Sequence, residues 1–182
     1  DIGICPTPAI PFLIKHFKIY SGIMISASHN PPEYNGIKIF DHYGHKLNKK
    51  KEIEIESYLN KIKSNLIFKK QKNISQRFDL LEIYKQNLIE SIGENNLNGM
   101  KIILDTCHGS ASVFAENIFK QLGASVYVIN SQADGSKINV NKYKDDHISA
   151  AQINPCVISA NLYINWVQSL PATPVGTRCR VP

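Results

Sequence analysis

Residues 100–130 alternate between strand-like and helix-like patterns, and this alternation constrains the fold more than any other feature. The runs 100–105 and 124–130 are short, apolar and rich in β-branched or aromatic residues. Between them, large apolar side chains recur at helical spacing over 109–123. A strand, a helix and a strand within about 30 residues predict a βαβ unit, whose two strands run parallel.

The first part of the chain also combines helices with short strands. A helix is expected over 8–16, with the Thr7 side chain as its N-terminal cap. The apolar run 22–27 predicts a buried strand that leads into a loop, and 37–40 predicts a second strand after an Asn-Gly turn signal. With a further amphipathic helix over 80–92, the pattern predicts the α/β class, with two mixed α/β domains of which the second contains the βαβ unit.

The net charge of +6 could indicate a nucleic acid partner, but its distribution argues against one. The segment 49–72 holds eight Lys and three Glu, which is most of the excess. Apolar residues recur there at roughly helical spacing, and only Tyr58 and Phe68 offer rings for base stacking. We therefore expect an exposed helix and connector, and no nucleic acid partner.

The cysteines and the apolar runs indicate in which cellular environment the protein is expected. The four cysteines lie far apart without a Cys-x-x-Cys pair, which argues against a zinc site and against a disulfide framework. No run approaches the roughly 18 apolar residues that a membrane span needs. We expect a reduced, cytoplasmic protein without a membrane partner.

One strand-loop-strand segment concentrates groups that can carry chemistry. Ser28 follows the first strand, where its hydroxyl could be displayed at the edge of the sheet. His29 and Lys38 could carry protons or face a phosphate. The alternative is that Ser28 and Asn30 only form the turn and that His29 is an ordinary exposed ring, because neighbouring Ser and His do not by themselves make a catalytic dyad. The residue types alone leave both interpretations open.

The sequence Gly-Ile-Met-Ile-Ser-Ala-Ser-His-Asn-Pro, followed by Asn-Gly-Ile-Lys, resembles the active-site serine loop of the α-D-phosphohexomutases. This family includes phosphoglucomutase, phosphomannomutase and phosphoglucosamine mutase, and the loop most resembles that of the phosphoglucosamine mutases. The resemblance continues at 6–9 and, in the second part of the chain, at 103–109, 122–124 and 133–139. It covers roughly residues 3–140.

The resemblance implies an intramolecular phosphotransferase that works through a phosphoserine. Ser28 would carry the phosphoryl group, and a Mg²⁺ ion would bind beside it through the phosphate. A small hexose phosphate would be the substrate: glucosamine 6-phosphate would become glucosamine 1-phosphate through a bisphosphate, for amino-sugar precursors of the cell wall. His29 and Lys38 match positions beside the reacting oxygens, with Lys38 the better candidate for the general acid or base. Phosphomannomutase or phosphoglucomutase activity is the alternative within the family.

The resemblance also implies domain boundaries. Residues 1–72 would be the C-terminal part of the first phosphohexomutase domain, with the serine loop, and 77–142 an incomplete second domain. The segment 143–182, where the resemblance fades, is expected to be a diverged or disordered tail.

Several departures from the family pattern bear on activity. Tyr34 and His108 replace residues that are usual at these positions, and the aspartate-rich metal loop Asp-Gly-Asp-x-Asp-Arg is absent. The cluster Asp145, Asp146 and His147 is a poor substitute, because adjacent side chains on an extended chain point to opposite faces. We therefore expect an inactive fragment of a phosphohexomutase, with a non-catalytic sugar-phosphate-binding remnant as the alternative. The sequence does not indicate an oligomeric state.

Overall fold

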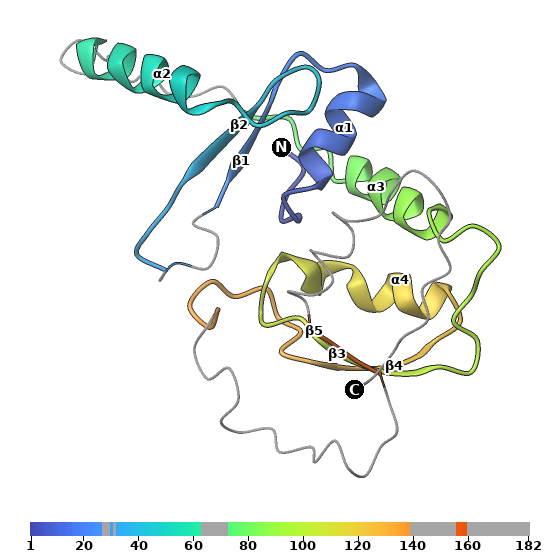
Figure 1. Ribbon diagram of the computed structural model, residues 1–182. Helices are drawn as coiled ribbons and strands as arrows, with labels where there is room; N and C mark the ends of the chain where they lie inside the picture. The colour runs from blue at the N-terminus through green and yellow to red at the C-terminus, as the bar shows by residue number, and fades with distance from the viewer. Residues whose placement is uncertain (27–29, 31, 63–72, 139–155, 160–182) are drawn as a thin grey trace. The chain divides into compact units, whose positions relative to one another are not determined.

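The computed structural model describes residues 1–26, 30, 32–62, 73–138 and 156–159. The chain divides into two compact units, Asp1–Leu81 and Glu82–Pro182. Both units contain helices and a small sheet (Figure 1). The α/β class predicted from the sequence is therefore confirmed.

The first unit is built around a β-hairpin with a helix on one face. Helix α1 (Ala9–Phe17) is followed by strand β1 (Gly22–Ile25), which pairs antiparallel with strand β2 (Ile37–Phe40). Gly22 allows the close approach of the helix, because a Cβ atom there would lie 2.7 Å from Cγ2 of Ile10 and 2.9 Å from Cδ1 of Ile14. This contact fixes the face of the hairpin that α1 covers.

Two expectations for this unit are corrected. Pro8, not Thr7, occupies the N-cap of α1, and no side chain caps the helix; the Thr7 backbone carbonyl instead accepts from the Ile10 amide at 3.2 Å. The first strand, predicted to be buried, keeps Ile23 and Ile25 more than half exposed. The reason is that α1 covers one face only, and alternate residues of a strand point to opposite faces.

Helix α2 (Lys49–Ile62) follows the hairpin and has no buried residue. It carries the first part of the basic segment, and acidic side chains neutralise part of the charge. Lys51 Nζ lies 3.0 Å from Glu54 Oε2, and Glu52 Oε1 lies 2.7 Å from Nζ of Lys46, which precedes the helix. The expectation of a solvent-exposed helix is confirmed for these residues.

The second unit has a three-stranded parallel sheet. After helix α3 (Asp79–Glu90), strand β3 (Lys101–Asp105) lies between strand β4 (Ser125–Ile129) and strand β5 (Cys156–Ser159), and both outer strands run parallel to it. Helix α4 (Ala115–Gln121) connects β3 to β4 and lies over the sheet (Figure 1). The predicted βαβ unit is confirmed.

The second unit departs from the prediction in two places. The single helix expected over 109–123 is split into a 3-10 turn, η2 (Ser110–Val113), and the shorter α4, because Phe114 has a non-helical backbone at φ −152°. Strand β5 lies in the segment expected to be a diverged or disordered tail, and the sequence analysis did not predict it.

The core of the second unit is continuous. Ile102, Leu104 and Phe114 are almost fully buried, and the Tyr84 ring meets the Phe114 ring edge-on with centroids 6.1 Å apart. Tyr84 lies in α3, so this helix belongs to the core of the unit.

Two further findings concern the environment. None of the helices in the described residues is long and apolar enough to cross a membrane. Among those residues, Cys5 is a buried thiol, and burial raises its pKa to about 11. A buried thiol with a raised pKa is a weak nucleophile, so Cys5 serves the packing of the first unit.

Candidate active site

The serine loop closes the β1–β2 hairpin. Ser28 and His29 lie outside the described residues, so the structure tests neither position. It does describe both ends of the loop: the Ser26 amide donates to the Gly36 carbonyl at 2.9 Å, one step beyond the last paired residues of the strands. The loop that contains Ser28 therefore starts and ends at one point of the hairpin.

Lys38 lies close to this closed end. It is the second residue of β2 and pairs with Met24, and its side chain is half-buried. Because pairing residues share a face, Lys38 lies on the same face as Gly22, which is the face that contacts α1. Of the three residues predicted to carry the chemistry, Lys38 is the one that the structure places.

Gly36 has a positioning role that the sequence analysis treated only as a turn signal. A Cβ atom on Gly36 would lie 2.9 Å from the Ser26 carbonyl oxygen. The Asn35 side chain supports the same turn, since its Oδ1 accepts from the Gly36 amide at 3.0 Å. A side chain at position 36 would therefore push apart the two ends of the serine loop.

A second polar cluster lies at the carboxyl end of β3. Asp105 Oδ1 accepts from the Cys107 amide and from Asn130 Nδ2, both at 2.9 Å. The buried Thr106 hydroxyl donates to the Asn130 carbonyl at 2.6 Å. Cys107, His108 and Asn130 all have positive φ, which is uncommon for residues other than glycine. These bonds hold the ends of β3 and β4 together and explain how the strained backbone persists.

Two further residues, His108 and Asp134, lie beside this cluster. His108, one of the departures from the family pattern, has Nδ1 3.1 Å from the Gln132 carbonyl, and its own carbonyl accepts from the Asp134 amide at 3.0 Å. The Ser136 hydroxyl, then Lys137 and the Ser136 amide, lower the pKa of Asp134 from 3.8 to about 2. Asp134 is therefore ionised and tied to its own turn.

The described residues do not fit a Mg²⁺ site. No group of three His, Cys, Asp or Glu side chains converges among them. Ser28 and the cluster Asp145, Asp146 and His147 lie outside the described residues. Since Mg²⁺ requires several oxygen ligands in near-octahedral geometry, the part of the chain that is described cannot hold the ion by itself.

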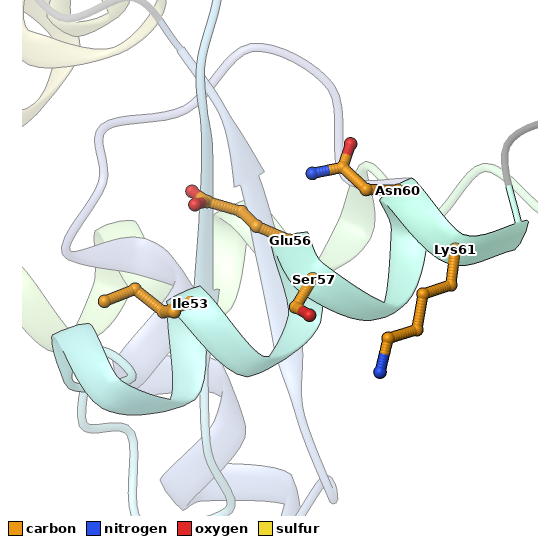
Figure 2. Close-up of a pocket in the computed structure, with 5 residues that line it drawn as sticks. All are labelled: Ile53, Glu56, Ser57, Asn60 and Lys61. Carbon is orange, nitrogen blue, oxygen red and sulfur yellow. The ribbon is translucent and has the colours of Figure 1, made fainter.

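A surface hollow of about 460 Å³ lies on α2, where its five lining residues all come from that one helix (Figure 2). They are Ile53, Glu56, Ser57, Asn60 and Lys61. Ile53 is 52% exposed. A hollow lined by one helix does not enclose a ligand, so it is not a candidate active site.

Comparisons with known proteins point to one family. A family model described as "Phosphoglucomutase/phosphomannomutase, alpha/beta/alpha domain I" matches residues 1–66. A curated protein of Prochlorococcus marinus (strain MIT 9312), named phosphoglucosamine mutase, is 55% identical over 142 residues, which cover 78% of this chain and 32% of the relative. A protein of the same name from strain MIT 9515 is 57% identical over 141 residues, or 77% of this chain and 31% of the relative. The chain thus spans about a third of the length of the curated relatives it matches.

A solved structure shares the fold. The crystal structure of a phosphoglucomutase/phosphomannomutase family protein from Burkholderia thailandensis aligns with a TM-score of 0.54 at 24% identity, over 76% of this chain and 31% of that chain. The match extends over most of this chain.

Proposed function

Because the chain belongs to the α-D-phosphohexomutase family, we propose that it supplies the phosphoryl-carrying serine of a phosphoglucosamine mutase. The observation that carries this proposal is the identity of 55% to a phosphoglucosamine mutase over 78% of this chain. The hairpin supports it, because it closes the Ser28 loop with Lys38 near its mouth. The substrate would be a small hexose phosphate, and the reaction would interconvert glucosamine 6-phosphate and glucosamine 1-phosphate.

The reaction consists of two balanced transfers. In the first, the C1 hydroxyl oxygen of glucosamine 6-phosphate attacks the phosphorus of phosphorylated Ser28, the bond from phosphorus to Ser28 Oγ breaks, and the 1,6-bisphosphate forms. In the second, Ser28 Oγ attacks the 6-phosphoryl group of that bisphosphate, and the bond to the C6 oxygen breaks to release glucosamine 1-phosphate. The serine ends as it began, phosphorylated, so no phosphate is consumed.

The two transfers also require proton movement, and Lys38 is our candidate for it. The attacking sugar hydroxyl loses a proton and the departing sugar oxygen gains one, so a group beside the loop must accept a proton and return it. Lys38 lies close to the mouth of the loop on the helix-covered face of the hairpin. We assign His29, adjacent to Ser28 in sequence, to stabilising the negative charge on the transferring group.

Mg²⁺ would offset the charge of the phosphoryl group, and the phosphate on Ser28 would be one of its ligands. Since the described residues do not form a site, its other ligands would come from elsewhere in the whole enzyme. The second candidate function is a sugar-phosphate-binding remnant without chemistry. We propose a cytoplasmic location, where thiols such as Cys5 stay reduced.

We propose no nucleic acid partner, because acidic side chains offset part of the basic segment. Glu54 pairs with Lys51 at 3.0 Å on the exposed helix α2, and Glu52 of the same helix pairs at 2.7 Å with Lys46, which precedes the helix.

The proposal is tested in a chimera in which the 142 matched residues replace their counterpart in the Prochlorococcus marinus relative. Incubation with labelled glucose 1,6-bisphosphate should place label on Ser28, and Ser28→Ala should abolish both the labelling and the mutase activity. Lys38→Gln should lower kcat by about 10²- to 10⁴-fold, the range for loss of general acid-base catalysis. Lys50→Gln on α2 is the matched control and should leave kcat unchanged.

Two results would contradict the proposal. Full labelling of the Ser28→Ala chimera would show that another residue carries the phosphoryl group. Saturable binding of glucosamine 6-phosphate without any labelling of Ser28 would favour the binding remnant. The 182-residue chain alone should show no turnover, and labelled Ser28 in that chain would contradict its predicted inactivity.

A further inference from the structure

Asn35 and Gly36 form an Asn-Gly pair at the closed end of the serine loop. The Gly36 amide donates to Oδ1 of the Asn35 side chain at 3.0 Å, so the side chain is folded back onto the amide that follows it. Asn35 is exposed to solvent. Among the described residues, the acceptor of the Gly36 amide is this side chain and not a backbone carbonyl. The Gly36 nitrogen is therefore held beside the side-chain carbonyl of Asn35 and is not tied into the pairing of the two strands.

A second Asn-Gly pair, Asn98 and Gly99, has different surroundings. The Asn98 side chain packs against Gly123, because Asn98 Oδ1 occupies the space that a Cβ atom on Gly123 would take. The Asn98 amide is fixed as well, since it donates to Asn96 Oδ1 at 3.1 Å. In the described part of the chain, the Gly99 amide makes no bond to the side chain before it. The two pairs thus share a sequence but differ in what holds the asparagine.

We propose that Asn35 is a site of spontaneous deamidation in the folded protein, with water as the co-reactant. Asparagine is among the thermolabile residues, and glycine has no Cβ atom to obstruct a ring closure. The Gly36 nitrogen loses its proton to base and attacks the side-chain carbonyl carbon of Asn35. The new bond from nitrogen to carbon forms, the bond from that carbon to Nδ2 breaks, and ammonia leaves with a proton. Water then opens the cyclic imide, which leaves aspartate or isoaspartate at position 35.

Deamidation of Asn35 would change the point at which the serine loop closes. The Gly36 carbonyl accepts from the Ser26 amide at 2.9 Å, and a Cβ atom on Gly36 would already lie 2.9 Å from the Ser26 carbonyl oxygen. Isoaspartate carries the main chain through the former side chain and so lengthens it beside this close contact. Both products also place a carboxylate three residues before Lys38. The modification therefore alters the spacing and the charge at the mouth of the loop.

The test compares the two pairs within one sample of the 182-residue chain. The chain is incubated at mildly alkaline pH, and peptide mass spectrometry follows the deamidated fraction at positions 35 and 98, with the isoaspartyl and aspartyl peptides separated by chromatography. We expect Asn35 to react several-fold faster than Asn98, because Asn98 must first leave its place against Gly123. The same chain in denaturant is the matched control, and there the two pairs should react at similar rates.

Two results would overturn the proposal. Equal rates in the folded chain, or a faster reaction at Asn98, would show that the folded-back side chain gives no advantage. An equally large preference for Asn35 in denaturant would assign that preference to the neighbouring residues and not to the fold. Asn35→Gln should abolish the reaction at position 35, because glutamine would have to close a larger ring, while Asn98 keeps its rate.

The effect on phosphoryl transfer rests on the proposed function and has its own readout. In the chimera with the Prochlorococcus marinus relative, labelling of Ser28 should fall in step with the isoaspartate fraction at position 35. Undiminished labelling of a largely deamidated chimera would refute this effect on the loop. A fresh chimera without any label on Ser28 would refute the proposed function, whereas the deamidation rates of the two pairs would still stand as measured.

Discussion

The two sheets of this chain are covered to different extents. Strand β3 carries three consecutive residues, Ile102, Ile103 and Leu104, that are each at most 7% exposed, so both of its faces are buried. Helix α1 covers one face of the hairpin strands, while on the other face Ile23, Ile25 and Ile37 are more than half exposed. The serine loop belongs to the less covered sheet. The chain thus contains one unit with a continuous core and one whose packing is incomplete within the described residues.

The largest expected effect is on the well-covered sheet. Leu104→Ala should lower the free energy of unfolding of the second unit by about 2–5 kcal/mol, because Leu104 is 1% exposed and its loss leaves a cavity. Denaturant unfolding monitored by circular dichroism measures the change. A loss below about 1 kcal/mol would show that neighbouring side chains move in to fill the cavity left by Leu104, and it would weaken the contrast between the two sheets.

A smaller effect is expected at the mouth of the serine loop. Gly36→Ala should destabilise the first unit by about 1–3 kcal/mol, because the added Cβ would lie 2.9 Å from the Ser26 carbonyl oxygen. Gly135→Ala is the matched control, since its Cβ would have no neighbour within 4 Å, and it should be neutral or slightly stabilising. Equal thermal unfolding midpoints for the two variants would contradict the positioning role of Gly36.

The next effect depends on pH and concerns the exposed turn after β4. The pKa of Asp134 is lowered to about 2, first by the Ser136 hydroxyl and then by Lys137. A lowered pKa in the folded state means that the ionised carboxylate stabilises that state above pH 4 and that this stabilisation is lost as the pH falls toward 2. Ser136→Ala should raise the pKa of Asp134 in an NMR titration. An unchanged pKa would show that the hydroxyl does not contribute.

The smallest effect is expected at Ile25, on the exposed face of the hairpin. Ile25→Ala in the 182-residue chain should change the free energy of unfolding by no more than about 0.5 kcal/mol, because the Ile25 side chain is 65% exposed. Denaturant unfolding monitored by circular dichroism measures the change. A loss of about 2 kcal/mol or more would show that this face is as well covered as the faces of β3 and would remove the contrast between the two sheets.

Much of the fold was predictable from local periodicity. The hairpin strands, β3, β4, α1 and α3 agree with the prediction to within a few residues, because their apolar spacing is regular and Gly or Pro residues mark several of their ends. Strand β5 was missed because four residues, Cys156–Ser159, give too short a pattern, and its strand character depends on pairing with β3. The break at Phe114 likewise left no periodic signal.

The candidate site was only partly predictable. The residue types identified the serine loop, and the structure places Lys38 near its mouth, while Ser28 and His29 stay predictions. The steric role of Gly36 could not be read from the sequence, because it depends on the distance to a carbonyl ten residues earlier. The expectation that the first strand is buried was wrong for Ile23 and Ile25, because a continuous apolar run does not say whether both faces of the strand have a covering layer.

The pairing of the short hairpin has a consequence for how the serine loop can change. Lys38 lies on the helix side only because it pairs with Met24, and a slip of one residue would carry it to the opposite side of the sheet. With four residues in each strand, few bonds resist such a slip. An insertion in the loop would therefore leave Lys38 on the same face only if the loop itself accommodated the extra residue and the pairing of the two strands stayed unchanged. The loop can vary in composition more freely than in length, because one misplaced step would move Lys38 from the face that α1 covers to the opposite face.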